Sequence, residues 1–124
     1  MDAYIEKLVV GWEETYRKGQ LNLWIMLALK DSAKHMADIK NFIISTSEGT
    51  VTADDKSIYR ALRRYYEAEL VNFHKVPSSS GPELKVYELT DIGWKVLEQF
   101  VERNIIHVLY KDSIRQLITK GKNE

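Results

Sequence analysis

The residues of this chain that are best suited to chemistry are three arginines on one predicted helix. The stretch SIYRALRRYYEAELV, residues 57–71, contains them within five positions, and Lys56 precedes it. No acidic residue occurs between Asp55 and Glu67, whereas a solvated helix surface usually carries charges of both signs. An arginine guanidinium can donate two hydrogen bonds to a phosphate or to guanine O6 and N7. The stretch alone leaves two alternatives, a nucleic-acid contact and a solvated surface.

The spacing of these residues predicts a helix with two different sides. At about 100° per residue, Ile58, Ala61, Leu62 and Tyr65 fall on one apolar side that can face a core. The opposite side, the basic face, consists of Lys56, Ser57, Tyr59, Arg60, Arg63 and Arg64. We expect the helix to start near Ala53 and to end near Glu69. Its expected N-cap is Thr52, with Asp55 three residues later in a variant of the capping box.

The residue types give little support for catalysis, metal binding or nucleotide binding. There are no cysteines, which excludes a thiolate metal site and a cysteine nucleophile. The three histidines fall on three different predicted elements, and no phosphate-binding, dinucleotide-binding or serine-hydrolase motif occurs. We therefore expect no enzyme, no metal and no cofactor.

The chain before the basic face predicts three helices. Apolar residues recur at helical spacing over residues 2–17, and residues 21–29 are apolar almost all round, as in the central helix of a small bundle. A third helix is expected over residues 35–45. The loop SEGTVT then leads to the helix with the basic face.

The chain after the basic face predicts a β-hairpin. Residues 70–76 and 84–90 alternate in the manner of strands, and the loop PSSSGPE between them contains two prolines and a glycine. The order of helix, helix, loop, helix and hairpin is that of a winged helix-turn-helix, mainly α with a small β-hairpin. In that geometry the last helix enters the major groove of DNA, and Lys75 and Lys85 of the hairpin would hold the flanking backbone. The hairpin thus favours DNA contact over a solvated surface.

A long C-terminal helix is expected over residues 91–120, with Thr90 as its N-cap. It would extend roughly 40 Å and carry apolar residues throughout its length. One contact face cannot cover so wide a stripe, so a second copy of the chain is the simplest partner. The alternative is a monomer in which helix 2–17 pairs with helix 91–120.

The bulk composition describes an ordinary globular chain. The 124 residues predict a single domain, 1–124, with a winged helix-turn-helix core over 18–90. Basic and acidic residues balance at 18 each, so a nucleic-acid site must come from local clustering. The start lacks a basic signal region and the longest apolar run is too short to span a membrane. We expect a cytoplasmic protein that does not bind membranes.

Several stretches together resemble the PadR family of winged-helix transcriptional regulators. KGQLNLWIMLAL, residues 18–29, is similar to the opening of the family's first core helix. KSIYRALRRY, residues 56–65, resembles its recognition helix, and YELTDIG, residues 87–93, matches its Tyr-x-Leu-Thr-x-x-Gly phrase. The glycine that normally ends the recognition helix is replaced by Glu69, and HMAD replaces the usual His-Gly-Tyr.

The resemblance implies a homodimeric, repressor-like protein that binds double-stranded DNA. It also implies that a small aromatic effector can lie between subunits, where Trp12 and Trp94 are candidate lining residues. Aromatic residues of amphipathic helices are more often simply part of a core. The alternative function is a winged-helix module that binds a protein partner and not DNA, which the neutral net charge favours.

Overall fold

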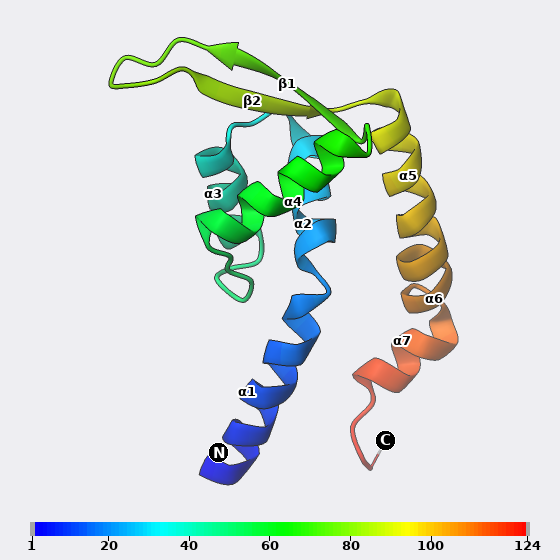
Figure 1. Cartoon of the computed structure of the whole chain (residues 1–124). Helices are drawn as coiled ribbons and strands as arrows, with labels where there is room; N and C mark the ends of the chain where they lie inside the picture. Colours follow the sequence, from blue (N-terminus) through cyan, green and yellow to red (C-terminus); the bar gives the residue numbers. More distant parts are fainter. Residues whose placement is uncertain (1, 124) are drawn as a thin grey trace.

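The computed structural model describes residues 2–123 and has the predicted order of elements (Figure 1). The helices are α1 (Ala3–Lys18), α2 (Leu21–Asp31), α3 (Met36–Thr46), α4 (Asp55–Glu67), α5 (Asp91–Val101), the π-helical η1 (Glu102–Ile106), α6 (His107–Leu109) and α7 (Asp112–Thr119). The strands are β1 (Val71–Val76) and β2 (Leu84–Leu89). The prediction of a mainly α protein with a small hairpin is confirmed.

The core lies where α2, α3, α4 and the hairpin meet. Its largest fully buried side chains are Ile25, Ile39, Ile43, Ile58, Leu62 and Val71. Each of the three helices contributes at least one of these residues, because each has apolar positions three or four residues apart. The apolar side predicted for the helix of the basic face is buried as expected, with Tyr65 at its C-terminal end.

The ends of α4 differ from the predicted ends by about two residues. Asp54, and not Thr52, is the N-cap: its carboxylate accepts a hydrogen bond of 2.7 Å from the backbone N–H of Ser57. A carboxylate at this position also interacts favourably with the helix dipole, so it displaces the earlier threonine. The helix ends at Glu67, because Glu69 adopts a left-handed conformation with φ of 63°.

The turn after α4 is a Schellman motif. The N–H of Leu70 donates to the carbonyl of Tyr65 at 2.8 Å, and the N–H of Glu69 donates to the carbonyl of Tyr66 at 3.1 Å. This turn sends the chain directly into β1 alongside α4. The left-handed position is the one where the resemblance noted above leads one to expect a glycine.

The strands form an antiparallel pair in which Phe73 lies opposite Tyr87 and Lys75 lies opposite Lys85. An isolated bridge between Lys34 and Tyr87 ties the segment before α3 to the edge of β2 that does not pair with β1. The hairpin therefore rests on the helical core at its base. Its tip projects beyond α4 (Figure 1).

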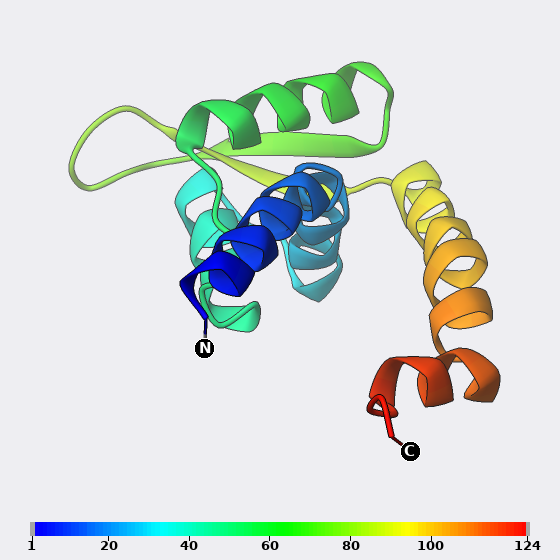
Figure 2. The same ribbon diagram turned by 90° about the horizontal axis from the view of Figure 1, so that it is seen from below.

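The single helix expected over residues 91–120 is wrong beyond residue 109. The chain passes from α5 through the π-helical turn η1 into α6, and then leaves helical geometry at Lys111, whose ψ is 139°. Helix α7 turns away from the line of α5 (Figures 1 and 2). Neither glycine nor proline marks this bend, which is why the sequence pattern missed it.

The terminal helices do not pair within the chain, so the helix pairing expected in the monomeric alternative is wrong. Within the described residues, α1 contributes no buried residue. Figures 1 and 2 both show α1 running away from α5. Apolar side chains of both helices face solvent, including Trp12, which is 78% exposed, and Phe100, which is 48% exposed.

Candidate nucleic-acid interface

The basic face forms the outer surface of α4. Lys56, Tyr59, Arg60, Arg63 and Arg64 are exposed, and Ser57 is half-buried. These side chains are outside because the apolar positions of the same helix turn inward against α2, α3 and the hairpin. Tyr59 and Arg63 lie on the flank toward the hairpin, whereas Ser57 and Arg64 lie on the other flank.

The acidic residues of α4 are held at its two ends. Asp54 caps the helix, and the N–H of Ser57 lowers the pKa of its carboxyl group, with a smaller contribution from the charge of Arg60. Asp55 accepts a bond of 3.1 Å from the Nζ of Lys40 on α3. Acidic charge therefore does not interrupt the middle of the basic face.

The last turn of α4 contains an ion pair that the sequence analysis did not consider. The Nε of Arg63 lies 3.4 Å from a carboxylate oxygen of Glu67, one turn later. Both side chains are largely exposed, and such exposed pairs contribute only about 0.2–1 kcal/mol. Arg63 can therefore leave Glu67 for a stronger partner, such as a phosphate or a guanine, at little cost. The spacing of four residues was a signal for this pair.

The two lysines predicted in the wing lie directly opposite each other across the strands. Their side chains are on the face of the hairpin that also carries Phe73 and Tyr87. Like charges in this cross-strand position repel each other and destabilise a hairpin. An anion bound between them would relieve the repulsion. Lys85 partly compensates within the chain, since its Nζ lies 4.8 Å from the centre of the Phe73 ring.

An aromatic cluster sets the distance between the hairpin and α4. The ring of Phe73 lies 5.0 Å from that of Tyr66 and 5.6 Å from that of Tyr87. Burial raises the pKa of the Tyr87 hydroxyl, so this side chain stays a neutral packing group. This cluster was not predicted from the sequence; the signal that could have found it is strand alternation, which puts Phe73 on one face of its strand and Tyr87 on one face of the other.

The structure brings three of the predicted residues around one recess. Tyr59 and Arg63 of α4 and Lys85 of β2 line a hollow between the helix and the wing, with the aromatic cluster as its floor. Lys75 lies further toward the tip of the hairpin and is exposed. Glu67, the ion-pair partner of Arg63, lines the same hollow, so its two cations and one carboxylate leave a net positive charge. Such a surface beside an exposed helix can contact phosphates and base edges.

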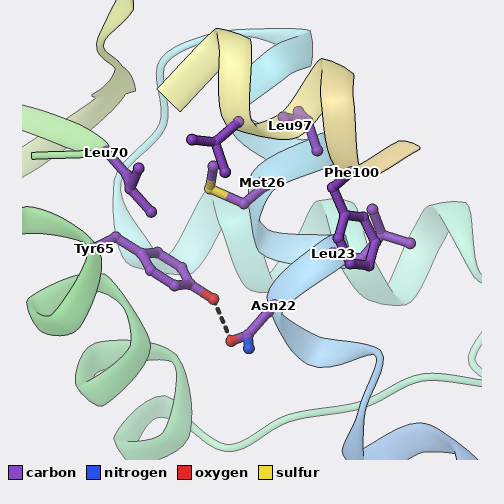
Figure 3. Close-up of a pocket in the computed structure, with 8 residues that line it drawn as sticks. Asn22, Leu23, Met26, Tyr65, Leu70, Leu97 and Phe100 are labelled. Carbon is purple, nitrogen blue, oxygen red and sulfur yellow. Dashed lines mark hydrogen bonds between the residues drawn. The ribbon is translucent and has the colours of Figure 1, made fainter. Parts of the chain in front are cut away.

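A second, more apolar recess is lined by residues of α2, α4 and α5 (Figure 3). Its volume is about 210 Å³, and it is lined by Asn22, Leu23, Met26, Tyr65, Leu70, Val96, Leu97 and Phe100. The hydroxyl of Tyr65 donates to the side-chain oxygen of Asn22 at its edge. Burial raises the pKa of Tyr65 to about 12, which keeps this hydroxyl protonated. The recess is open between α2, α4 and α5.

The two tryptophans predicted for an effector pocket lie apart in the single chain. Trp12 is on α1, where it lines a shallow apolar patch with Val9 and Tyr16. Trp94 is on α5, and the Nζ of Lys30 lies 5.8 Å from its ring centre. The residues that line the recess of Figure 3 include neither tryptophan.

The rest of the described chain has few features of other functional classes. Among residues 2–123, no group of three or more His, Cys, Asp or Glu side chains could hold a metal ion. Over the same residues, no helix combines the length and apolar character of a membrane span.

One known protein family matches most of the chain. The model of the family described as "Transcriptional regulator PadR-like family" matches residues 25–99, which extend from α2 into α5. A comparison with curated proteins finds no match.

Solved structures with the same fold come from several bacteria. A PadR-like transcription factor from Bacteroides fragilis is 25% identical, with a TM-score of 0.59, and the match covers 79% of this chain and 98% of that chain. A PadR family transcriptional regulator from Eggerthella lenta is 20% identical, with a TM-score of 0.69 over 97% and 100% of the two chains. Bacillus subtilis PadR in complex with operator DNA is 22% identical, with a TM-score of 0.60 over 65% and 46%.

Proposed function

Because the chain belongs to the PadR-like family of transcriptional regulators, we propose that it binds double-stranded DNA in a sequence-specific manner. Helix α4 would enter the major groove, and the hairpin would lie on the adjacent backbone. The operator complex of Bacillus subtilis PadR, which has the same fold, supports this use of the fold. The proposal includes a repressor-like role and a cytoplasmic location, both expected from the sequence.

The observation that carries the proposal is the continuity of cationic groups from α4 to the wing. Arg63 and Lys85 border one recess, and Lys75 extends the same strand face toward the tip. On a solvated surface, two opposed lysines beside a helix with three arginines would only repel each other. A row of phosphates would offset this repulsion, since each cation would then face a negative charge.

The roles of the individual side chains follow from their places. Arg60 at the centre of the basic face and Arg63 on its flank toward the hairpin would contact guanine edges or phosphates, and Arg64 on the other flank would contact phosphate. Tyr59, Ser57 and Lys56 would position the helix through hydrogen bonds and charge near its start. Lys75 and Lys85 would hold the backbone beside the groove.

We propose that the active form is a homodimer through α1 and the helices from α5 to α7. The support is the apolar surface that both regions expose, which includes Leu8 and Trp12 on α1 and Phe100 and Leu117 after the wing. Exposed patches of this kind mark interfaces in soluble proteins. Two recognition helices related by a two-fold axis would enter major grooves about 34 Å apart.

An effector site is part of the same proposal. A small aromatic molecule would lie between the two subunits, with Trp12 and Trp94 as its stacking surfaces. Support comes from the exposure of both rings, 78% and 37%, on helices that a second copy would cover. Quenching of tryptophan fluorescence by planar aromatic compounds would test this part, with Trp94→Leu as the diagnostic variant and Trp24→Phe on α2 as its control.

The alternative function is a winged-helix module for a protein partner, which the net charge of zero favours. Salt separates the two functions. Duplex recovered from a random library by the native protein would be labelled, and its binding measured by fluorescence anisotropy between about 50 and 300 mM salt. DNA binding predicts a steep loss of affinity with salt and a preference over scrambled duplex. If the native protein recovers no duplex from the library at the lowest salt, the DNA-binding proposal is refuted.

A further inference from the structure

The junction between α4 and α5 is held by one threonine side chain. Thr90 is the N-cap of α5, and its Oγ1 accepts a bond of 3.0 Å from the N–H of Gly93. The same Oγ1 donates a bond of 2.6 Å to the carbonyl of Glu69 in the turn that ends α4. The backbone N–H of Thr90 donates to the carbonyl of Leu70 at 3.1 Å. One hydroxyl thus connects the start of one helix to the end of the other.

Gly93 brings the two backbones into direct contact. A Cβ atom at this position would lie 2.0 Å from the carbonyl oxygen of Leu70, far closer than any real contact of this kind. Because the obstacle is backbone in a hydrogen-bonded turn, only a shift of α5 would make room for a side chain. The carbonyl of Glu69 is turned toward Thr90 by the left-handed residue of the Schellman motif.

Beyond this junction α5 touches the core through Leu97 and Val101. Leu97 is its one further buried residue among those described, whereas Val96 and Phe100 are nearly half exposed. The open recess of Figure 3 separates its next turn from α2 and Tyr65. The first turn, with Thr90 and Gly93, is where α5 makes its close contact with the turn after α4.

A small rotation at the junction would have a large effect at the far end. The helical segment from α5 through α6 spans residues 91–109, about 28 Å at 1.5 Å per residue. A rotation of about 10° at its base would displace its end by roughly 5 Å, which exceeds the 3.4 Å rise of one base pair.

We propose that Thr90 and Gly93 are positioning residues, which fix the angle between the DNA-reading core and α5 and so set the separation of two recognition helices. The proposal rests on the proposed function, since that separation has meaning only in a dimer on DNA. Neither residue contacts DNA in this account. They act through the carbonyls of Glu69 and Leu70.

The angle can be measured without DNA. The chain has no cysteine, so two introduced cysteines would carry the only spin labels. Asn41→Cys on α3 and Glu98→Cys on α5 are suitable, because both side chains are exposed. Labelled chains diluted in excess unlabelled protein report the distance within one chain. We expect a narrow distribution for native Thr90 and for Thr90→Ser, and a broad one for Thr90→Val. A narrow distribution for Thr90→Val would overturn the proposal.

A second variant protects the test against a loss of folding. Gly93→Ala keeps the hydroxyl contacts but forces the backbones apart, so it should shift the mean distance. Thr52→Val, an exposed threonine outside the junction, is the matched control and should leave the distribution unchanged. An unshifted, narrow distribution for Gly93→Ala would also overturn the proposal.

The consequence for DNA is measured with the selected duplex and with a duplex that contains one of its two arms. For Thr90→Val we expect the ratio of two-arm to one-arm affinity to fall about tenfold or more, with one-arm affinity within about twofold of native. An equal loss on both duplexes, or no loss on either, would overturn the positioning role. If native protein shows no preference for two arms, the proposed dimer fails, and the intrachain distance still decides whether the junction holds α5.

Discussion

The left-handed residue at the end of α4 gives the sharpest test of the local structure. Glu69 has φ of 63°, and a residue with a Cβ atom pays about 1–2 kcal/mol for this conformation. Glycine adopts it without strain but loses about 0.5–1 kcal/mol more in conformational entropy on folding. The difference predicts that Glu69→Gly stabilises the protein by roughly 0.5–1 kcal/mol. The contact to Thr90 is preserved, since it uses the Glu69 carbonyl.

The assay is urea and thermal unfolding followed by circular dichroism. For a domain of this size the predicted gain raises Tm by about 2–5 °C. Glu48→Gly is a matched variant, because Glu48 follows α3 with φ of 53° in the same kind of turn. It should also stabilise. Glu67→Gly changes the last helical position of α4 and should destabilise by about 1 kcal/mol.

The Tm values of these variants show whether backbone strain at Glu69 outweighs the contacts of its side chain. If Glu69→Gly lowers Tm while Glu48→Gly raises it, the Glu69 side chain has a stabilising contact that outweighs its backbone strain. If both variants lower Tm, the strain of the left-handed conformations is smaller than the conformational entropy that glycine loses on folding.

The remaining predictions concern DNA binding and acid stability. Arg63→Ala should weaken binding to the selected duplex by about 1–3 kcal/mol and relax the preference at one base position, as anisotropy with single-base variants would show. Lys85→Ala should weaken binding to all duplexes alike and lower the slope of log affinity against log salt by about one per protomer. Asp54→Asn should reduce the loss of stability in acid, as urea midpoints at successive pH values would show. The pKa of Asp54 is lowered in the folded state, so its stabilisation is present above the unfolded pKa and is lost as pH falls through the folded value.

Local patterns in the sequence determined the elements and their order. Apolar spacing placed Ile58, Leu62 and Tyr65 on the inner side of α4, and the basic face on the outer side followed from the same period. Thr90 could be predicted as a cap, because threonine is a preferred N-cap residue and an acidic residue follows it in the first turn. The strands were visible through alternation, which is enforced by a hairpin with one covered face.

The start of α4 was predicted two residues too early, because two residues before it can act as caps. Thr52 and Asp54 both precede α4, and the choice depends on which side chain reaches a free N–H. The bend at Lys111 has no glycine or proline to mark it. At both places neighbouring residues have similar helix propensities, so the energies of alternative helix boundaries differ little. Local preference therefore does not fix the boundary.

The site and its supports depended on the tertiary structure. Strand register alone put Lys75 opposite Lys85, and packing alone brought Arg63 and Lys85 to one recess. The sequence showed Gly93 as part of the motif YELTDIG. Only the fold shows that the carbonyl of Leu70 occupies the place where a side chain at position 93 would lie. Residue types and periods act over a few neighbours, whereas these contacts join segments that meet only when the core forms.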